Sequence, residues 1–68
     1  MSELIFAVDE APKGGYTARA VGASIYTEAD DWPGLREAAR DAVRCHFEDE
    51  DRPRVIRLRL VREDIIAA

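Results

Sequence analysis

The 68-residue sequence has a single cysteine, Cys45, and no apolar stretch near the roughly 20 residues that a membrane span requires. One cysteine excludes an internal disulfide, and a chain this short usually needs a disulfide, a metal or a partner to complete its core. Its size also excludes the crevice between two large layers in which nucleotide cofactors bind. We therefore expect no cofactor, and we expect self-association or a partner protein to complete the core.

Basic residues are fewer than acidic ones, 10 against 14, which gives a net charge of -4. This balance opposes general binding to nucleic acid, which depends on neutralising phosphates, so DNA is not an expected ligand. It favours a basic protein partner. The first six residues have no basic region followed by an apolar run, so they do not form a secretory signal. With a free thiol and no membrane span, we expect a cytoplasmic protein.

Hydrophobic periodicity predicts one small domain over residues 1–68. Alternating apolar residues predict strands at 3–9, 16–21, 24–27 and 54–61, with a glycine turn at 10–15. Between the last two strands, apolar residues at helical spacing run from Trp32 to Phe47, with Asp30 as the expected N-cap. The order is ββ(β)αβ, and the helical crossover makes the last strand parallel to the first. The fold class is α+β, with one helix on a four-stranded sheet.

One face of this sheet is left without a covering layer. If the strand parities hold, this open face carries seven residues: Ile5, Thr17, Arg19, Val55, Arg57, Arg59 and Val61. A bare face and open sheet edges both favour a partner. We expect the part of this face on the last strand, Val55, Arg57, Arg59 and Val61, to mediate self-association.

The organisation resembles the HicB-like antitoxin family, whose fold is similar to a truncated ribonuclease H. The matching segments are Gly-Gly-Tyr-Thr-Ala at 14–18, Thr-Glu-Ala-Asp-Asp-Trp at 27–32, and the Leu-Arg-Glu-Ala helix that begins at Leu35. The family's Leu-Pro-Gly-Cys type segment is replaced by Ala-Val-Gly-Ala-Ser at 20–24. We expect no counterpart of the family's C-terminal DNA-binding domain and hence no autoregulation through DNA. The resemblance implies a non-catalytic module that neutralises a HicA-like ribonuclease toxin and forms homo-oligomers.

Four consecutive acidic residues follow the predicted helix: Glu48, Asp49, Glu50 and Asp51. Negative charge is unfavourable near the C-terminus of a helix, whose dipole is negative there. An acidic patch is the surface that a basic ribonuclease would meet. We therefore expect this acidic run to contact the partner, although the ordinary interpretation of such a run is a solvated loop.

The sequence offers weak support for catalysis. The acidic residues Asp9, Glu10, Glu28, Asp30 and Asp31 invite comparison with a two-metal nuclease, but Asp30 and Asp31 are better explained as helix caps. Cys45 and His46 are adjacent in a helix, so they point about 100° apart and do not chelate one metal. We expect a half-buried thiol at Cys45, a histidine at the core edge, no metal site and no enzymatic activity.

Two alternatives stay open. In the first, the arginines of the last strand, Arg54, Arg57, Arg59 and Arg62, contact RNA phosphates. Against it stand the net charge and the lack of an aromatic platform beside them. In the second, the protein is an orphan that associates only with itself. The nucleic-acid alternative predicts that reversing the charge of Arg57 and Arg59 abolishes RNA binding.

Overall fold

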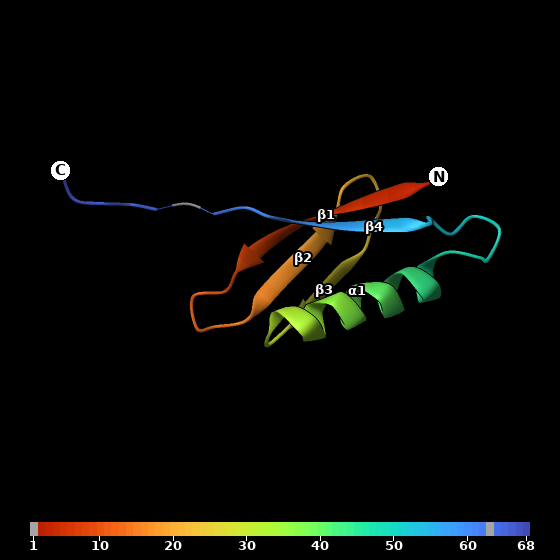
Figure 1. Ribbon diagram of the computed structural model, residues 1–68, viewed down its shortest axis with the longest axis horizontal. Helices are drawn as coiled ribbons and strands as arrows, with labels where there is room; N and C mark the ends of the chain where they lie inside the picture. The colour runs from red at the N-terminus through yellow and green to blue at the C-terminus, as the bar shows by residue number, and fades with distance from the viewer. Residues whose placement is uncertain (1, 63) are drawn as a thin grey trace.

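The computed structural model describes residues 2–62 and 64–68, and it places one helix on one face of a four-stranded sheet (Figure 1). The elements are β1 (Glu3–Glu10), β2 (Tyr16–Ala20), β3 (Tyr26–Ala29), α1 (Trp32–His46) and β4 (Val55–Leu60). This is the expected α+β arrangement. No helix in the described part of the chain has the length and apolar character to cross a membrane.

The strand order in the sheet is β3-β2-β1-β4. β1 and β2 pair antiparallel, as do β2 and β3, whereas β4 lies parallel to β1. The turn between β1 and β2 is closed by a hydrogen bond from the Ala11 amide to the Gly15 carbonyl, 2.9 Å. The parallel pairing confirms the prediction for a last strand that follows a helical crossover.

The core is a single layer of side chains between the sheet and α1. Alternating residues of β1, namely Leu4, Phe6 and Val8, are almost completely buried. The helix contributes Leu35, Ala39 and Val43 from successive turns, and the buried apolar cluster is Leu4, Phe6, Val8, Ala18, Ala20, Ile25, Leu35, Ala39 and Val43. Most of this set follows the two periodicities that the sequence displays, 2 for a strand and 3.6 for a helix.

The third strand lies two residues later than predicted, at Tyr26–Ala29 instead of 24–27. The reason is the turn after β2, where Gly22 has φ 88° and the Ala20 amide donates to the Ile25 carbonyl at 2.9 Å. This turn places Tyr26 opposite Arg19, so the pairing with β2 begins there and continues to Ala29. Ile25 is buried in the core at the end of the turn.

The N-cap of α1 is Asp31, and the prediction of Asp30 was wrong. The Asp31 carboxylate accepts a hydrogen bond from the Gly34 amide at 2.7 Å. An N-cap side chain bonds the N–H of the second or third helical residue, and here the second is Pro33, which has none. The cap therefore closes on Gly34, three residues after Asp31.

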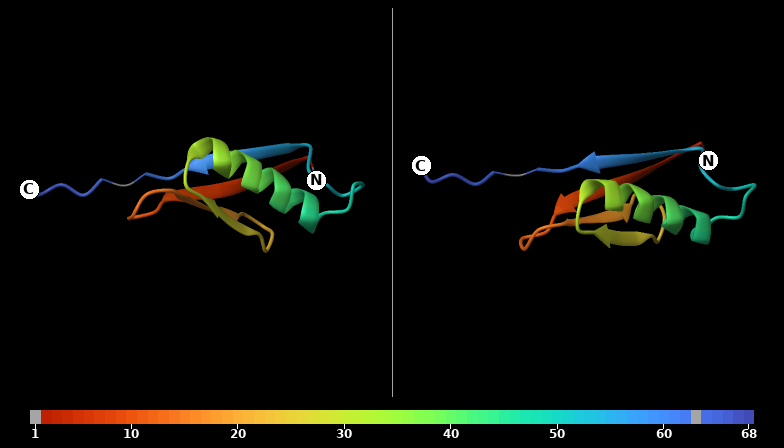
Figure 2. Two further views of the ribbon diagram at one scale, coloured as in Figure 1. Left: turned by 90° about the horizontal axis from the view of Figure 1, so that it is seen from below. Right: turned by 60° about the horizontal axis from the view of Figure 1, so that its bottom comes forward.

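α1 packs mainly against β3 and β2 and only lightly against β4 (Figure 2). Its axis is therefore displaced toward one side of the sheet, away from β4. The segment that follows β4 extends away from the body of the molecule (Figure 1), with Ile65 and Ile66 almost fully exposed. As a result, β4 is an edge strand that is paired on one side and thinly covered.

Candidate interaction surfaces

The glycine turn fixes the end of the sheet where β1, β2 and β3 meet the start of α1. Gly14 and Gly15 have φ values of 100° and 83°, which side chains of L-residues rarely adopt. A Cβ on Gly15 would also lie 2.8 Å from the Ala29 carbonyl oxygen, whereas one on Gly14 would meet nothing. Gly15 is therefore needed both for its conformation and for the close approach of the β1–β2 turn to the end of β3.

Tyr16 follows these glycines and packs edge-on against Trp32, with ring centroids 5.3 Å apart. This contact joins the start of β2 to the first turn of α1, and both rings are half-buried against the core. Aromatic pairs in this geometry contribute about 0.5–1.5 kcal/mol beyond the area they bury. The Gly-Gly-Tyr segment at 14–16 and the Asp-Trp segment at 31–32 therefore contact each other through the Tyr16–Trp32 pair, here called the joint.

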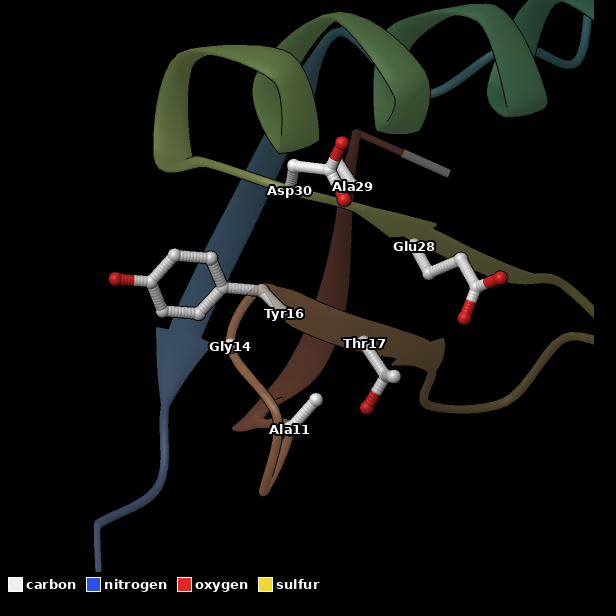
Figure 3. Close-up of a pocket in the computed structure, with 7 residues that line it drawn as sticks. All are labelled: Ala11, Gly14, Tyr16, Thr17, Glu28, Ala29 and Asp30. Atoms are coloured by element: carbon white, nitrogen blue, oxygen red, sulfur yellow. The ribbon is translucent and has the colours of Figure 1, made fainter.

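A shallow hollow next to this joint is lined by Ala11, Gly14, Tyr16, Thr17, Glu28, Ala29 and Asp30 (Figure 3). Thr17 and Glu28 are paired neighbours on β2 and β3, so they share one face of the sheet. Tyr16 extends away from both of them (Figure 3). The polar groups do not converge on one point, so the hollow lacks the arrangement of a binding or catalytic site.

The carboxylates compared with a two-metal nuclease do not assemble into a site. Asp31 is engaged as the helix cap, and Glu10 forms an ion pair with Arg62, 3.7 Å. Across residues 2–62 and 64–68, no group of three or more His, Cys, Asp or Glu side chains could hold a metal ion. Cys45 and His46 are both exposed, which corrects the expectation of a half-buried thiol and a core-edge histidine.

The acidic run, Glu48 to Asp51, forms the exposed loop between α1 and β4. Asp49 pairs with Arg52 at 2.9 Å, and none of the other three carboxylates has an ion pair among the described residues. The loop follows the C-terminal end of α1, where the helix dipole is also negative. The negative charge of this loop is therefore largely unneutralised within the described part of the chain.

The open face of the sheet carries the predicted residues of β1, β2 and β4, and the register adds Glu3, Asp9 and Glu28, which the prediction did not include. The register places Val55 beside Glu3, Arg57 beside Ile5 and Arg59 beside Ala7, all on the face opposite the helix. Exposed apolar side chains on or beside this face are Val21, Tyr26, Val55 and Val61. Arg57 pairs with Glu3 at 2.6 Å, which offsets part of the positive charge of β4.

Sequence reasoning missed two adjoining pockets between α1 and β4, which share Arg40 and Ile56 and are together called the groove below. Ile56, Leu58 and Ala39 line its apolar part, and its rim is formed by arginines of the helix and of the segment that precedes β4: Arg36, Arg40, Arg44, Arg52 and Arg54. The signal was present in part, since Arg36, Arg40 and Arg44 recur every four residues and so form one stripe along a helix. Periodicity alone did not show that this stripe borders β4.

Comparison with known proteins places the chain among small proteins of archaea and bacteria. A UPF0150 protein of Archaeoglobus fulgidus is 50% identical over 52 residues, which cover 76% of this chain and 77% of the relative. The chain belongs to the UPF0150 family. A UPF0150 protein of Thermotoga maritima is 40% identical over 65 residues, 96% of this chain and 91% of the relative. No protein-family model matches the chain, and no solved structure matches it.

Proposed function

We propose that this UPF0150 protein is a non-catalytic interaction module that resembles the toxin-neutralising domain of HicB antitoxins. It acts in the cytoplasm as a homo-oligomer and binds a basic, HicA-like ribonuclease toxin, whose RNA-cleaving surface it covers. The observation that carries the proposal is the exposed acidic loop, in which three of four carboxylates lack an ion pair among the described residues.

The physical basis of the proposal is electrostatic complementarity. Ribonucleases bind a polyanion, so their active surfaces are positively charged. A protein that presents several carboxylates at one end of an otherwise mixed surface attracts such a partner and orients it during encounter. Glu48, Glu50 and Asp51 are suited to this role because ion pairing within the described part of the chain does not neutralise them.

The one-sided sheet supports the same proposal. A single helix covers one face, and apolar side chains such as Tyr26 and Val55 are exposed on the other. A sheet with a bare face and open edges usually acquires a second layer or a neighbouring strand from another chain. We propose that Val55, Arg57, Arg59 and Val61 contribute to contacts between copies of this protein.

The test measures RNA cleavage by a purified HicA-type ribonuclease from the same organism, with this protein added in increasing amounts. We expect inhibition that is complete near stoichiometric amounts. A variant that neutralises the acidic loop, with Glu48→Gln, Asp49→Asn, Glu50→Gln and Asp51→Asn, should inhibit at least about tenfold less well, the equivalent of about 1.4 kcal/mol.

The matched control removes the same number of charges elsewhere, with Asp9→Asn, Glu10→Gln, Glu28→Gln and Asp30→Asn. These residues lie at the other end of the molecule and are exposed. The control should inhibit like the unmodified protein. If both variants lose inhibition to the same extent, net charge and not the loop governs binding, and if neither loses any, the acidic loop does not contact the toxin. Absence of inhibition by the unmodified protein would overturn the proposed function.

RNA binding is a second candidate, and the observation in its favour is the arginine rim of the groove between α1 and β4. The sequence-based hypothesis that the arginines in and beside β4 contact RNA is weakened by two ion pairs, Arg57–Glu3 and Arg62–Glu10, which partly neutralise them. Reversing Arg57 and Arg59 to glutamate tests that hypothesis directly. Loss of binding to a labelled RNA would support it, whereas unchanged RNA affinity, or none in either protein, would exclude it.

A further inference from the structure

The outer edge of β4 has backbone groups available for pairing. The amides of Val55 and Val61 donate to Ser2 and Val8 respectively, so odd-numbered residues of β4 direct their backbone groups toward β1. Successive residues of a strand alternate, and Ile56, Leu58 and Leu60 therefore direct their N–H and C=O groups away from the sheet. β4 lies at the edge of the sheet, and these groups can accept a further strand.

The groove between α1 and β4 runs beside this edge. Ile56 and Leu58 are half-buried, and Leu60 is 40% exposed, because the helix covers β4 only lightly. Arg36 and Arg40 form the helical side of the groove next to Ile56 and Leu58. A segment added at this edge would thus meet apolar side chains and positive charge on the helix side of the sheet.

The segment after β4 has the complementary chemistry. Asp64, Ile65 and Ile66 are all exposed, and the two isoleucines are 89% and 86% accessible. Residues 64–68 lie beyond the end of β4 and away from the body of the molecule (Figure 1). An acidic residue followed by large apolar residues matches a groove with an apolar floor and an arginine rim.

The segment is poorly suited to occupy the groove of its own chain. To do so it would have to reverse direction just after Leu60, in Val61-Arg62-Glu63-Asp64. Tight hairpins favour glycine or asparagine at their positions of positive φ, and this stretch has neither. Its one residue that tolerates positive φ is Asp64, at its end. A second copy meets no such restriction, since its segment arrives already extended.

We propose that two copies of this protein exchange the segments that follow β4, each adding its residues 64–68 as an antiparallel strand to the β4 edge of the other. This inference specifies the self-association included in the proposed function and needs no toxin. A two-fold axis perpendicular to the sheet places both helices on the same side. Even-numbered residues of one copy then lie directly opposite even-numbered residues of the other. Ile66 of one copy faces Ile56 of the other, and Asp64 faces Leu58.

This register satisfies three requirements together. The even-numbered residues that face one another are the ones whose backbone groups point outward on β4, so the hydrogen bonds of the new pair form without rotation of either strand. Ile66 lies in the groove on Ile56, and Asp64 lies near Arg36 and Arg40. The exchange is reciprocal, and it closes at two copies.

The first test is a disulfide between copies. In a Cys45→Ser background, the pair Ile56→Cys and Ile66→Cys should be oxidised to a covalent dimer, because directly opposite Cα atoms in a hydrogen-bonded pair lie about 5.5 Å apart. The two positions are too distant along one extended strand to react within a chain. The control pair, Ile56→Cys with Ile65→Cys, places one thiol on the other face and should remain monomeric. Equal crosslinking of both pairs, none in either, or a ladder beyond the dimer would overturn the exchange.

The second test exchanges charges and is measured by sedimentation equilibrium. Arg40→Glu and Asp64→Arg should each raise the dimer dissociation constant at least about tenfold, and the double variant should restore it. Lys13→Glu, a charge reversal at an exposed residue of the β1–β2 turn, serves as a control that leaves the dimer unchanged.

The outcomes separate this inference from the proposed function. A dimer insensitive to all these changes overturns the exchange and leaves self-association intact. If the unmodified protein is a monomer, both the strand exchange and self-association are overturned. Inhibition of the toxin is measured in a separate assay and does not depend on this result. A monomer that binds a labelled RNA through Arg40 would assign the groove to nucleic acid and overturn the exchange.

Discussion

At the scale of residues, the stability of this small domain depends on a few large side chains. Leu4, Phe6, Val8, Leu35 and Val43 are the largest fully buried ones, and alternation or helical spacing identified each of them in the sequence. The N-cap could not be identified in the same way. Asp30 and Asp31 are adjacent carboxylates, and the hydrogen bond from the Gly34 amide to the Asp31 carboxylate, which only the structure shows, identifies Asp31 as the cap.

Replacing Leu35 with alanine should lower the free energy of unfolding by about 2–5 kcal/mol, since it removes a fully buried side chain from a core of one layer. Urea unfolding followed by circular dichroism measures the change. Val21→Ala, at a side chain that is 61% exposed, is the control and should stay within about 0.5 kcal/mol of the unmodified protein. A similar loss in both variants would contradict the assignment of the core.

Replacing Asp31 with alanine should cost about 1 kcal/mol of stability, because the Gly34 amide loses its acceptor. Asp30→Ala removes the same charge one residue earlier and should have little effect. The two variants are compared by thermal unfolding in the same buffer. If Asp30→Ala were the more destabilising, the cap would belong to the residue that the sequence suggested.

At the scale of elements, periodicity predicted every strand and the helix but not the lateral position of α1 on the sheet. Helical periodicity predicts which side chains of α1 face the sheet, but it does not predict which strands of the sheet they pack against. The lighter cover of β4, and with it the arginine-rimmed groove, follows from that position. The shift of β3 has a similar cause, since the register is set by the geometry of the turn at Gly22.

The β1–β2 turn offers a test of element packing. Gly15→Ala should lower stability by about 1–2 kcal/mol for its positive φ, and further because the new Cβ meets the Ala29 carbonyl oxygen at 2.8 Å. Gly14→Ala carries only the conformational cost. Chemical denaturation of both variants measures the difference. Equal losses would show that the turn does not approach the end of β3 as closely as described.

At the scale of the whole molecule, charge is separated more than the net value of -4 suggests. Unneutralised carboxylates gather in the loop after α1, whereas arginines gather along the groove between α1 and β4. Three of these arginines, Arg40, Arg44 and Arg52, are ion-paired with Glu37, Asp41 and Asp49. Composition predicted an acidic protein that favours a basic partner. It could not show that a basic groove lies on the same molecule, because that depends on which helical face borders β4.

The proposed contact with a ribonuclease is electrostatic, and we expect its association rate to fall steeply as salt is raised from low to physiological concentration. Stopped-flow fluorescence of Trp32 or of a labelled ribonuclease measures the rate. The association rate of the variant with all four acidic-loop residues neutralised should depend less steeply on salt than that of the control variant with residues 9, 10, 28 and 30 neutralised. Identical slopes would place the contact away from Glu48–Asp51.

The most direct test of the central claim is isothermal titration of this protein into a purified HicA-type ribonuclease from the same organism. We expect saturable binding at a fixed stoichiometry, weakened by salt and by neutralising the acidic loop, and accompanied by loss of RNA cleavage. Absence of heat and of inhibition at low salt, with both proteins folded, would contradict this expectation.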